Sequence, residues 1–175
     1  LLHGKLDLDH IGLAGHSYGA NTAQALMGQA SRVRNPSTEP RIDAFLPMSP
    51  SAPQVMKPEQ AFGKVTAPVL CMTGTKDTNP LSKRMTPESR QLVYQGLPEG
   101  DKFQLVLKDA QHHAFAGSGR ESKFHIPHHH PAIQKLSTLF WDAYLKGSQE
   151  AKAKLQSNQA KELAGLKMGD VWEWK

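Results

Sequence analysis

Short apolar runs, each closed by glycine, proline or polar residues, recur along the chain. They occupy residues 11–15, 42–48, 69–74 and 103–107. Runs of this length, bounded by turn-forming residues and containing aliphatic and aromatic side chains, are typical of strands rather than of helices. The pattern therefore predicts four strands.

Segments with helical character lie between and after these strands. Helix formers fill 20–30 and 88–96, apolar side chains recur at helical spacing over 131–147, and a lysine- and alanine-rich helix is expected over 148–166. Residues 171–174 form a short aromatic tail. Strands separated by helices predict an α/β fold with a mostly parallel sheet of about four strands and helices on both faces. Ligands bind such sheets at the carboxyl ends of the strands.

The composition is typical of one globular domain covering residues 1–175. Hydrophobic residues make up 38% and charged residues 21% of the 175 residues, which is close to globular averages. Every apolar run is far shorter than the roughly 20 residues of a membrane-spanning helix. The net charge of +5 comes largely from lysines scattered through the C-terminal third. Because aromatic residues are not interleaved with them, we expect a solvated helical face and no nucleic-acid partner.

The first of the predicted strands leads into the sequence Gly15-His16-Ser17-Tyr18-Gly19. This is the G-x-S-x-G pattern, which between a strand and a helix marks a sharp turn that exposes a nucleophilic serine. We expect both glycines to be required, because a side chain at either position would collide with the neighbouring strand or helix. The pattern predicts Ser17 as the nucleophile and the backbone N–H of Tyr18 as an oxyanion donor.

A serine nucleophile requires a base and an orienting carboxylate, expected in the chain order serine, acid, histidine. Asp77 follows the third predicted strand and is the best candidate for the acid. Asp43 lies within a strand and Asp101 precedes one, so both are worse placed. Asp109 is a closer competitor, but it shares the loop of the candidate histidines.

Two adjacent histidines, His112 and His113, follow the fourth predicted strand. Successive side chains diverge, so only one of them can face Ser17. We favour His112 and keep His113 as the alternative base. A turn aspartate at position 77 and non-catalytic histidines are the structural alternatives.

Further histidines at 125 and 128–130 raise the question of a metal site. Adjacent histidines cannot all point at one ion, no carboxylate or cysteine stands at ligand spacing, and the flanking prolines indicate a loop. We therefore expect no physiological metal, and the serine chemistry requires no cofactor.

Several segments together resemble bacterial hydrolases of the dienelactone-hydrolase-like group, which are related to platelet-activating-factor acetylhydrolases and polyester-cleaving esterases. The resemblance covers nearly the whole chain and is carried by Leu8–Ala20, Met72–Asp77, His112 with Phe115, and Phe140–Gly147. It implies an α/β-hydrolase fold, a Ser-His-Asp triad, and a small-molecule or polymer ester as substrate. In relatives the catalytic histidine usually stands three residues before a phenylalanine, which favours His112.

The resemblance also implies that the chain is the C-terminal part of such a domain. Relatives carry the first strands of the sheet, and a loop with the second oxyanion donor, before the serine turn. Residues 1–6 contain neither an initiator methionine nor signal-peptide features, so we expect a start within a longer protein. Any export signal would lie upstream.

Two other functions fit the same pattern. Oligopeptidases also carry a G-x-S-Y-G turn, which makes peptide or amide cleavage the nearest alternative. A catalytically silent binding module that keeps the turn for its architecture is the third.

Overall fold

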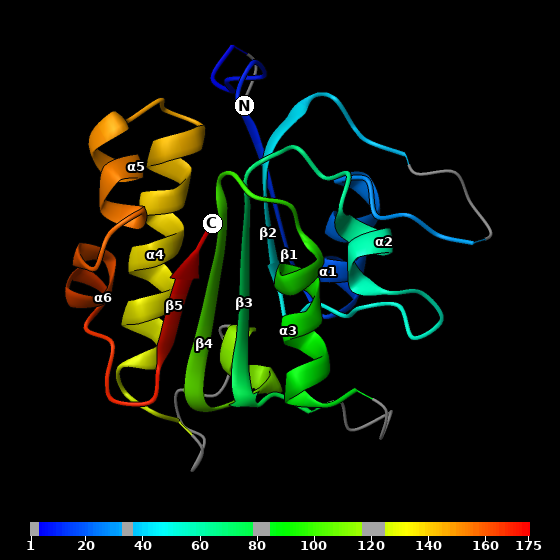
Figure 1. Cartoon of the computed structure of the whole chain (residues 1–175). Helices are drawn as coiled ribbons and strands as arrows, with labels where there is room; N and C mark the ends of the chain where they lie inside the picture. Colours follow the sequence, from blue (N-terminus) through cyan, green and yellow to red (C-terminus); the bar gives the residue numbers. More distant parts are fainter. Residues whose placement is uncertain (1–3, 33–36, 79–84, 117–124) are drawn as a thin grey trace.

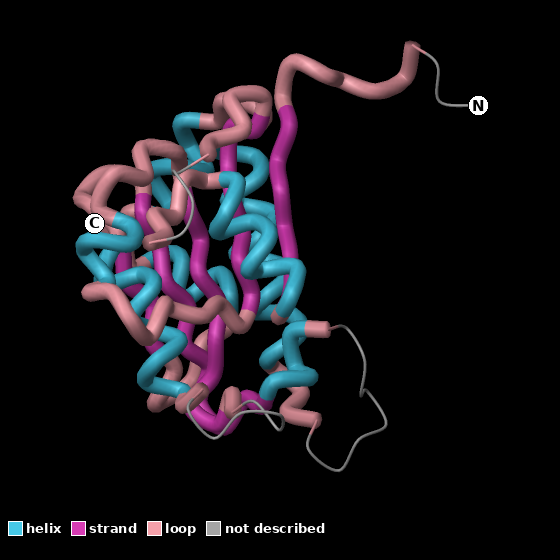
Figure 2. The backbone as a smooth tube through the Cα atoms, turned by 90° about the vertical axis from the view of Figure 1, so that its right-hand side faces the viewer, coloured by secondary structure: helices cyan, strands magenta, loops and turns pink. Residues whose placement is uncertain are grey.

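The computed structural model describes residues 4–32, 37–78, 85–116 and 125–175. Residues 1–3, on which the expected start within a longer protein partly rests, lie outside the described residues. Residues 4–10 extend away from the sheet, as Figure 2 shows. None of the described helices is long and apolar enough to cross a membrane.

One sheet organises the described chain (Figure 1). Its five strands lie in the order of the sequence: β1 (Ile11–His16), β2 (Ile42–Met48), β3 (Val69–Lys76), β4 (Lys102–Gln111) and β5 (Val171–Trp174). Strands β1 to β4 pair in parallel, and β5 pairs antiparallel with β4. The predicted α/β fold with a mostly parallel sheet is confirmed.

Helices cover both faces of the sheet (Figure 1). One face carries α1 (Tyr18–Leu26), α2 (Pro58–Phe62) and α3 (Pro87–Gly96), and the other carries α4 (His129–Tyr144), α5 (Gln149–Leu155) and α6 (Gln159–Ala164). A single-turn 3-10 helix, η1 (His112–Phe115), follows β4.

Alternation along the strands divides the core into two layers. Ala44 and Leu46 of β2 point toward α4, whereas Phe45 between them packs with residues of α1 and α3 on the opposite face. Side chains alternate in this way because successive residues of a strand face opposite sides of the sheet. Both layers are apolar, as expected for a sheet covered on two sides.

The structure corrects several predicted elements. Residues 171–174 are a fifth strand rather than a tail, and the predicted helix over 148–166 is two helices, α5 and α6. The fourth strand extends to Gln111, so the expected polar loop begins only at the histidines. The short helix α2 was not predicted.

Parallel pairing brings the carboxyl ends of β1 to β4 to the same edge of the sheet. Ser17 directly follows β1, Asp77 directly follows β3, and His112 directly follows β4. The three predicted side chains therefore leave the sheet at one edge.

Candidate active site

Ser17 occupies the sharp turn between β1 and α1. Its backbone has φ 57° and ψ −111°, a conformation outside the usual regions for a residue with a side chain. Its N–H donates to the carbonyl of Met48 at 3.0 Å, which ties the turn to the end of β2. A strained backbone of this kind persists where the surrounding structure holds it in place.

The two glycines of the turn differ in what they require. A Cβ at Gly15 would lie 2.2 Å from the carbonyl oxygen of Gly19, so the strand and the helix approach closely only because residue 15 has no side chain. At Gly19, a Cβ would meet nothing within 4 Å. The expected collision holds for Gly15 and is wrong for Gly19, whose added atom would point away from the described residues.

Asp77 is fully buried just after β3. Its Oδ2 accepts a hydrogen bond of 2.9 Å from the hydroxyl of Thr73, which lies in β3. Its Oδ1 lies 2.8 Å from Nδ1 of His112. A buried carboxylate needs several donors to offset the loss of water, and Thr73 and His112 supply two of them.

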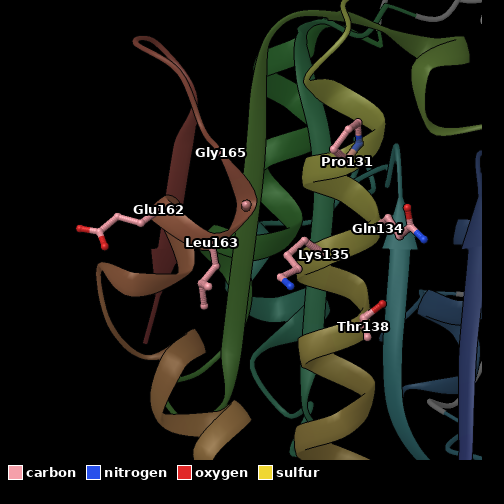
Figure 3. Close-up of a pocket in the computed structure, with 8 residues that line it drawn as sticks. Pro131, Gln134, Lys135, Thr138, Glu162, Leu163 and Gly165 are labelled. Carbon is pink, nitrogen blue, oxygen red and sulfur yellow. The ribbon is translucent and has the colours of Figure 1, made fainter.

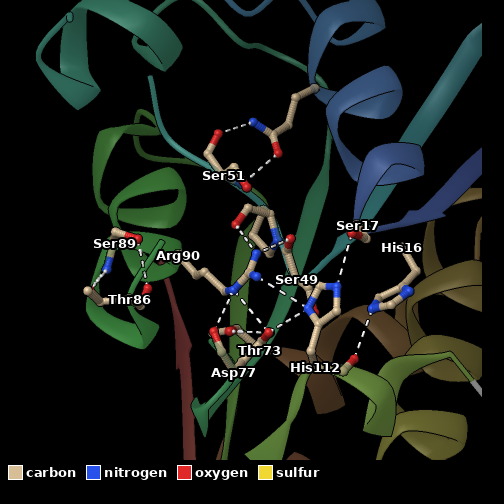
Figure 4. A network of polar contacts seen from close by, with 12 residues as sticks. His16, Ser17, Ser49, Ser51, Thr73, Asp77, Thr86, Ser89, Arg90 and His112 are labelled. Carbon is tan, nitrogen blue, oxygen red and sulfur yellow. Dashed lines mark hydrogen bonds and ion pairs between the residues drawn. The ribbon is translucent and has the colours of Figure 1, made fainter. Parts of the chain in front are cut away.

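The ring of His112 lies between the serine and the carboxylate (Figure 4). Because a carboxylate only accepts, the contact with Asp77 favours the tautomer with the proton on Nδ1. Nε2 is then an acceptor, and it lies 3.0 Å from Oγ of Ser17. Of the two candidate histidines, His112 is the one that joins Ser17 to Asp77, and His113 follows it in η1.

Tyr18 is the first residue of α1, with Ser17 in the N-cap position. The N–H groups of a first helical turn have no partner within the helix, and the helix dipole places partial positive charge there. The Tyr18 N–H is thus suited to donate a hydrogen bond to a developing oxyanion. Its side chain is 80% exposed beside the serine.

His16 was not among the predicted site residues, but it supports the base. Its Nε2 donates to the backbone carbonyl of His112 at 2.9 Å, and the two ring centroids are 4.6 Å apart. Burial, and then the proximity of His112, lower the pKa of His16 below its ordinary value. A neutral ring with its proton on Nε2 can make this contact without adding charge beside the base.

Arg90 of α3 was also missed. Its guanidinium is buried and contacts the carboxylate of Asp77 at 3.0 Å. The sequence held a signal, because Arg90 shares the i, i+3, i+4 spacing of the apolar face with Val93 and Tyr94. An arginine on an apolar helix face is unusual unless it has a buried partner.

The competing aspartates contact other residues. Asp43 accepts a hydrogen bond from the Ile11 N–H at 2.8 Å, and Asp101 pairs with Lys152 at 2.9 Å. Asp109 lies within β4 and pairs with Lys76 at 2.9 Å.

The histidine cluster is organised differently from the prediction. Asp170, remote in sequence, lies 2.8 Å from Nε2 of His128, and one potential ligand atom from each of His128, His129 and Asp170 lies within 4.8 Å of the others. No carboxylate stands at ligand spacing in the sequence, but the fold brings Asp170 beside His128 from 42 positions away. The Lys108 backbone bonds to two members of this cluster: its carbonyl accepts from His129, and its N–H donates to Asp170. These bonds join the start of α4 to β4 and to the turn before β5.

A hollow of about 560 Å³ lies between α4 and α6 (Figure 3). It is lined by Pro131, Gln134, Lys135, Thr138, Glu162, Leu163, Ala164 and Gly165. None of these residues carries a candidate catalytic group.

No known family model matches the chain. No curated protein matches it either.

Proposed function

We propose that this chain is the C-terminal part of an α/β-hydrolase and cleaves carboxylic esters through an acyl-enzyme. The observation that carries the proposal is the continuous contact from Ser17 Oγ to His112 Nε2 and from His112 Nδ1 to Asp77. The chain order serine, acid, histidine and the placement after β1, β3 and β4 also fit a hydrolase of this class.

The first half of the proposed reaction forms the acyl-enzyme. Ser17 Oγ attacks the ester carbonyl carbon while its proton passes to Nε2 of His112, and Asp77 stabilises the imidazolium. The carbonyl oxygen becomes an oxyanion, to which the Tyr18 N–H donates. When the tetrahedral intermediate collapses, the C–O bond to the alcohol breaks and Nε2 returns its proton to the departing oxygen.

The second half uses the same groups with water. His112 takes a proton from a water molecule, whose oxygen attacks the acyl carbon. The intermediate then expels Ser17 Oγ, which regains a proton from the imidazolium, and the carboxylic acid leaves. The resemblance to dienelactone-hydrolase-like enzymes favours esters over amides, and it implies that an upstream loop provides the second oxyanion donor.

Ester turnover by the full-length protein and its Ser17→Ala variant tests the proposal. With p-nitrophenyl acetate and butyrate, we expect the substitution to lower kcat by about 10⁶-fold, to the level left by the remaining groups. Equal turnover by the two proteins would refute it. Tyr18→Phe, which keeps the backbone N–H, is the matched control and should retain activity.

A fluorophosphonate probe separates the remaining functions. Labelling that disappears in Ser17→Ala indicates an activated serine, whereas an unlabelled, folded wild-type protein would indicate a silent binding module. Parallel assays with p-nitroanilide peptides then separate ester from amide hydrolysis, and we expect the esters to be the better substrates.

A further inference from the structure

Arg90 lies at an unusual place for a cation. It comes from the middle of α3, and its exposed fraction is only 1%. Taking a guanidinium out of water is costly unless its donors find acceptors of good geometry. Burial lowers the pKa of Arg90 and the charge of Asp77 opposes that shift, but an arginine stays protonated in proteins.

The donors of Arg90 converge on the loops that follow three neighbouring strands (Figure 4). Nε lies 2.7 Å from the backbone carbonyl and 3.0 Å from Oδ1 of Asp77, after β3. Nη1 donates to the carbonyls of Ser49 at 2.7 Å and Pro50 at 3.2 Å, after β2. Nη2 lies 3.2 Å from Nδ1 of His112, after β4.

The contact with His112 has a consequence for the ring. When Nδ1 carries the proton that Asp77 accepts, Nη2 and Nδ1 are both donors and cannot bond to each other. Nδ1 then donates to Oδ1 of Asp77, which also lies 3.0 Å from Nε of Arg90, so the guanidinium occupies the space beside Nδ1. A rotation of the imidazole away from Asp77 would bring it against Arg90, which leaves Nε2 directed at the serine.

The loop after β2 is held by the same side chain. Ser49 has φ 52° and is fully buried, and its N–H donates to Met72 of β3. Its neighbour Met48 accepts the hydrogen bond from the Ser17 N–H. Arg90 therefore fixes the acid directly and reaches the serine turn through a single intervening loop.

We propose that Arg90 is a positioning residue of the triad, holding Asp77 and the 49–50 loop so that His112 presents Nε2 to Ser17. This inference rests on the proposed function. Its role differs from that of a merely structural cation because, among the described residues, its side-chain polar contacts all end on the acid, on the base or on the loop next to the nucleophile.

The test compares Arg90→Gln and Arg90→Lys with a matched control in the full-length protein. Lys102 is a second buried cation, 1% exposed. Its Nζ bonds to the carbonyls of Thr66 and Gly100, near the start of β4 and therefore at the other end of the strands from the triad. Lys102→Gln removes a buried charge far from the triad. For each variant, kcat, KM for p-nitrophenyl butyrate, and the thermal unfolding midpoint are measured.

We expect Arg90→Gln to lower kcat about 100-fold while KM changes by less than about threefold, since small displacements of catalytic groups act on the chemical step. Arg90→Lys keeps the charge without the planar fork and should recover part of that loss, with kcat about tenfold below wild type. Lys102→Gln should lower the unfolding midpoint and leave kcat near wild type.

Two results would overturn the inference. One is a folded Arg90→Lys or Arg90→Gln protein with wild-type kcat. The other is a loss of kcat in Lys102→Gln equal to that in the Arg90 variants, which would indicate a general effect of stability. If Arg90→Gln does not fold, Arg90→Lys alone decides.

Ser17→Ala, assayed in parallel, keeps the two proposals apart. Full activity in Ser17→Ala would refute the proposed function itself. An inactive Ser17→Ala protein, together with Arg90 variants of wild-type activity, would refute only the role proposed for Arg90.

Discussion

The carboxylate of Asp77 shows how one buried side chain can be oriented completely. Oδ1 lies 2.8 Å from His112 Nδ1 and 3.0 Å from Arg90 Nε, and Oδ2 accepts from Thr73 at 2.9 Å. Donors at both oxygens leave the carboxylate one orientation, in which Oδ1 faces the ring. Thr73 comes from β3, the strand that Asp77 follows, whereas His112 and Arg90 come from other elements.

Substitution of Gly15 tests the close approach at the serine turn. Gly15→Ala would place a Cβ 2.2 Å from the Gly19 carbonyl oxygen, a backbone atom that cannot move alone. We expect a loss of about 1–3 kcal/mol in the free energy of unfolding, as for other overpacked positions. Urea denaturation followed by circular dichroism measures it.

Gly19→Ala is the matched control for that substitution. The added Cβ meets nothing within 4 Å of it in the described chain, and alanine favours a helix over glycine by up to about 1 kcal/mol. We expect unchanged or slightly increased stability. Equal destabilisation by the two alanines would contradict the geometry of the turn.

Strand β5 depends on one residue for most of its contact with the core. Trp172 is 2% exposed, its ring stacks on Phe103 with centroids 5.7 Å apart, and its indole N–H donates to the Leu155 carbonyl at 3.0 Å. These contacts join β5 to β4 and to the end of α5. Strand β5 therefore forms one edge of the sheet, and Trp172 packs into the core shared with the C-terminal helices.

Removing this indole should be costly. We expect Trp172→Ala to lower the free energy of unfolding by about 3–5 kcal/mol, as for other buried aromatic residues. Trp174→Ala is the control, because its side chain is 37% exposed, and should cost less than half as much. Similar values for the two variants in urea denaturation would contradict the assignment of Trp172 to the core.

Two partly or fully buried histidines, His16 and His129, should cost the chain stability in mildly acidic solution. Burial, and then neighbouring histidines, lower the pKa values of His16 and His129 below 6.5. As pH falls through 6.5, the unfolded chain binds protons before the folded chain does, so the free energy of unfolding decreases. The contribution of these neutral rings is complete above pH 6.5 and is lost between 6.5 and the lower folded pKa values.

Urea denaturation at pH 7.5 and pH 5.5 measures this loss. Burial by itself would raise the pKa of Asp170, but the Lys167 and Lys108 N–H groups together with His128 lower it, and its effect belongs below pH 3.8. His129→Gln keeps a donor for the Lys108 carbonyl and removes one titrating ring. It should therefore show a smaller difference between the two pH values, and an unchanged difference would exclude a contribution from His129.

Local patterns were sufficient for most elements and insufficient for those stabilised by distant contacts. The runs at 42–48 and 69–74 predicted strands because both are apolar and bounded by turns. The four residues at 171–174 are too short to be recognised alone, and pairing with β4 makes them a strand. The residues between α5 and α6 include no proline or glycine, so the sequence does not indicate that one helix ends there and another begins.

The sequence by itself determined the alternation of strands and helices, the turn at Ser17, and the order in which serine, acid and histidine follow the strands. These features depend on residues that are close in the sequence, so local conformational preferences are sufficient to predict them. Only the tertiary structure decided that His112 rather than His113 lies between Ser17 and Asp77, that Arg90 joins three loops, and that Asp170 meets His128. Such contacts link residues between 13 and 95 positions apart, and their partners are fixed by the packing of the sheet rather than by any local pattern.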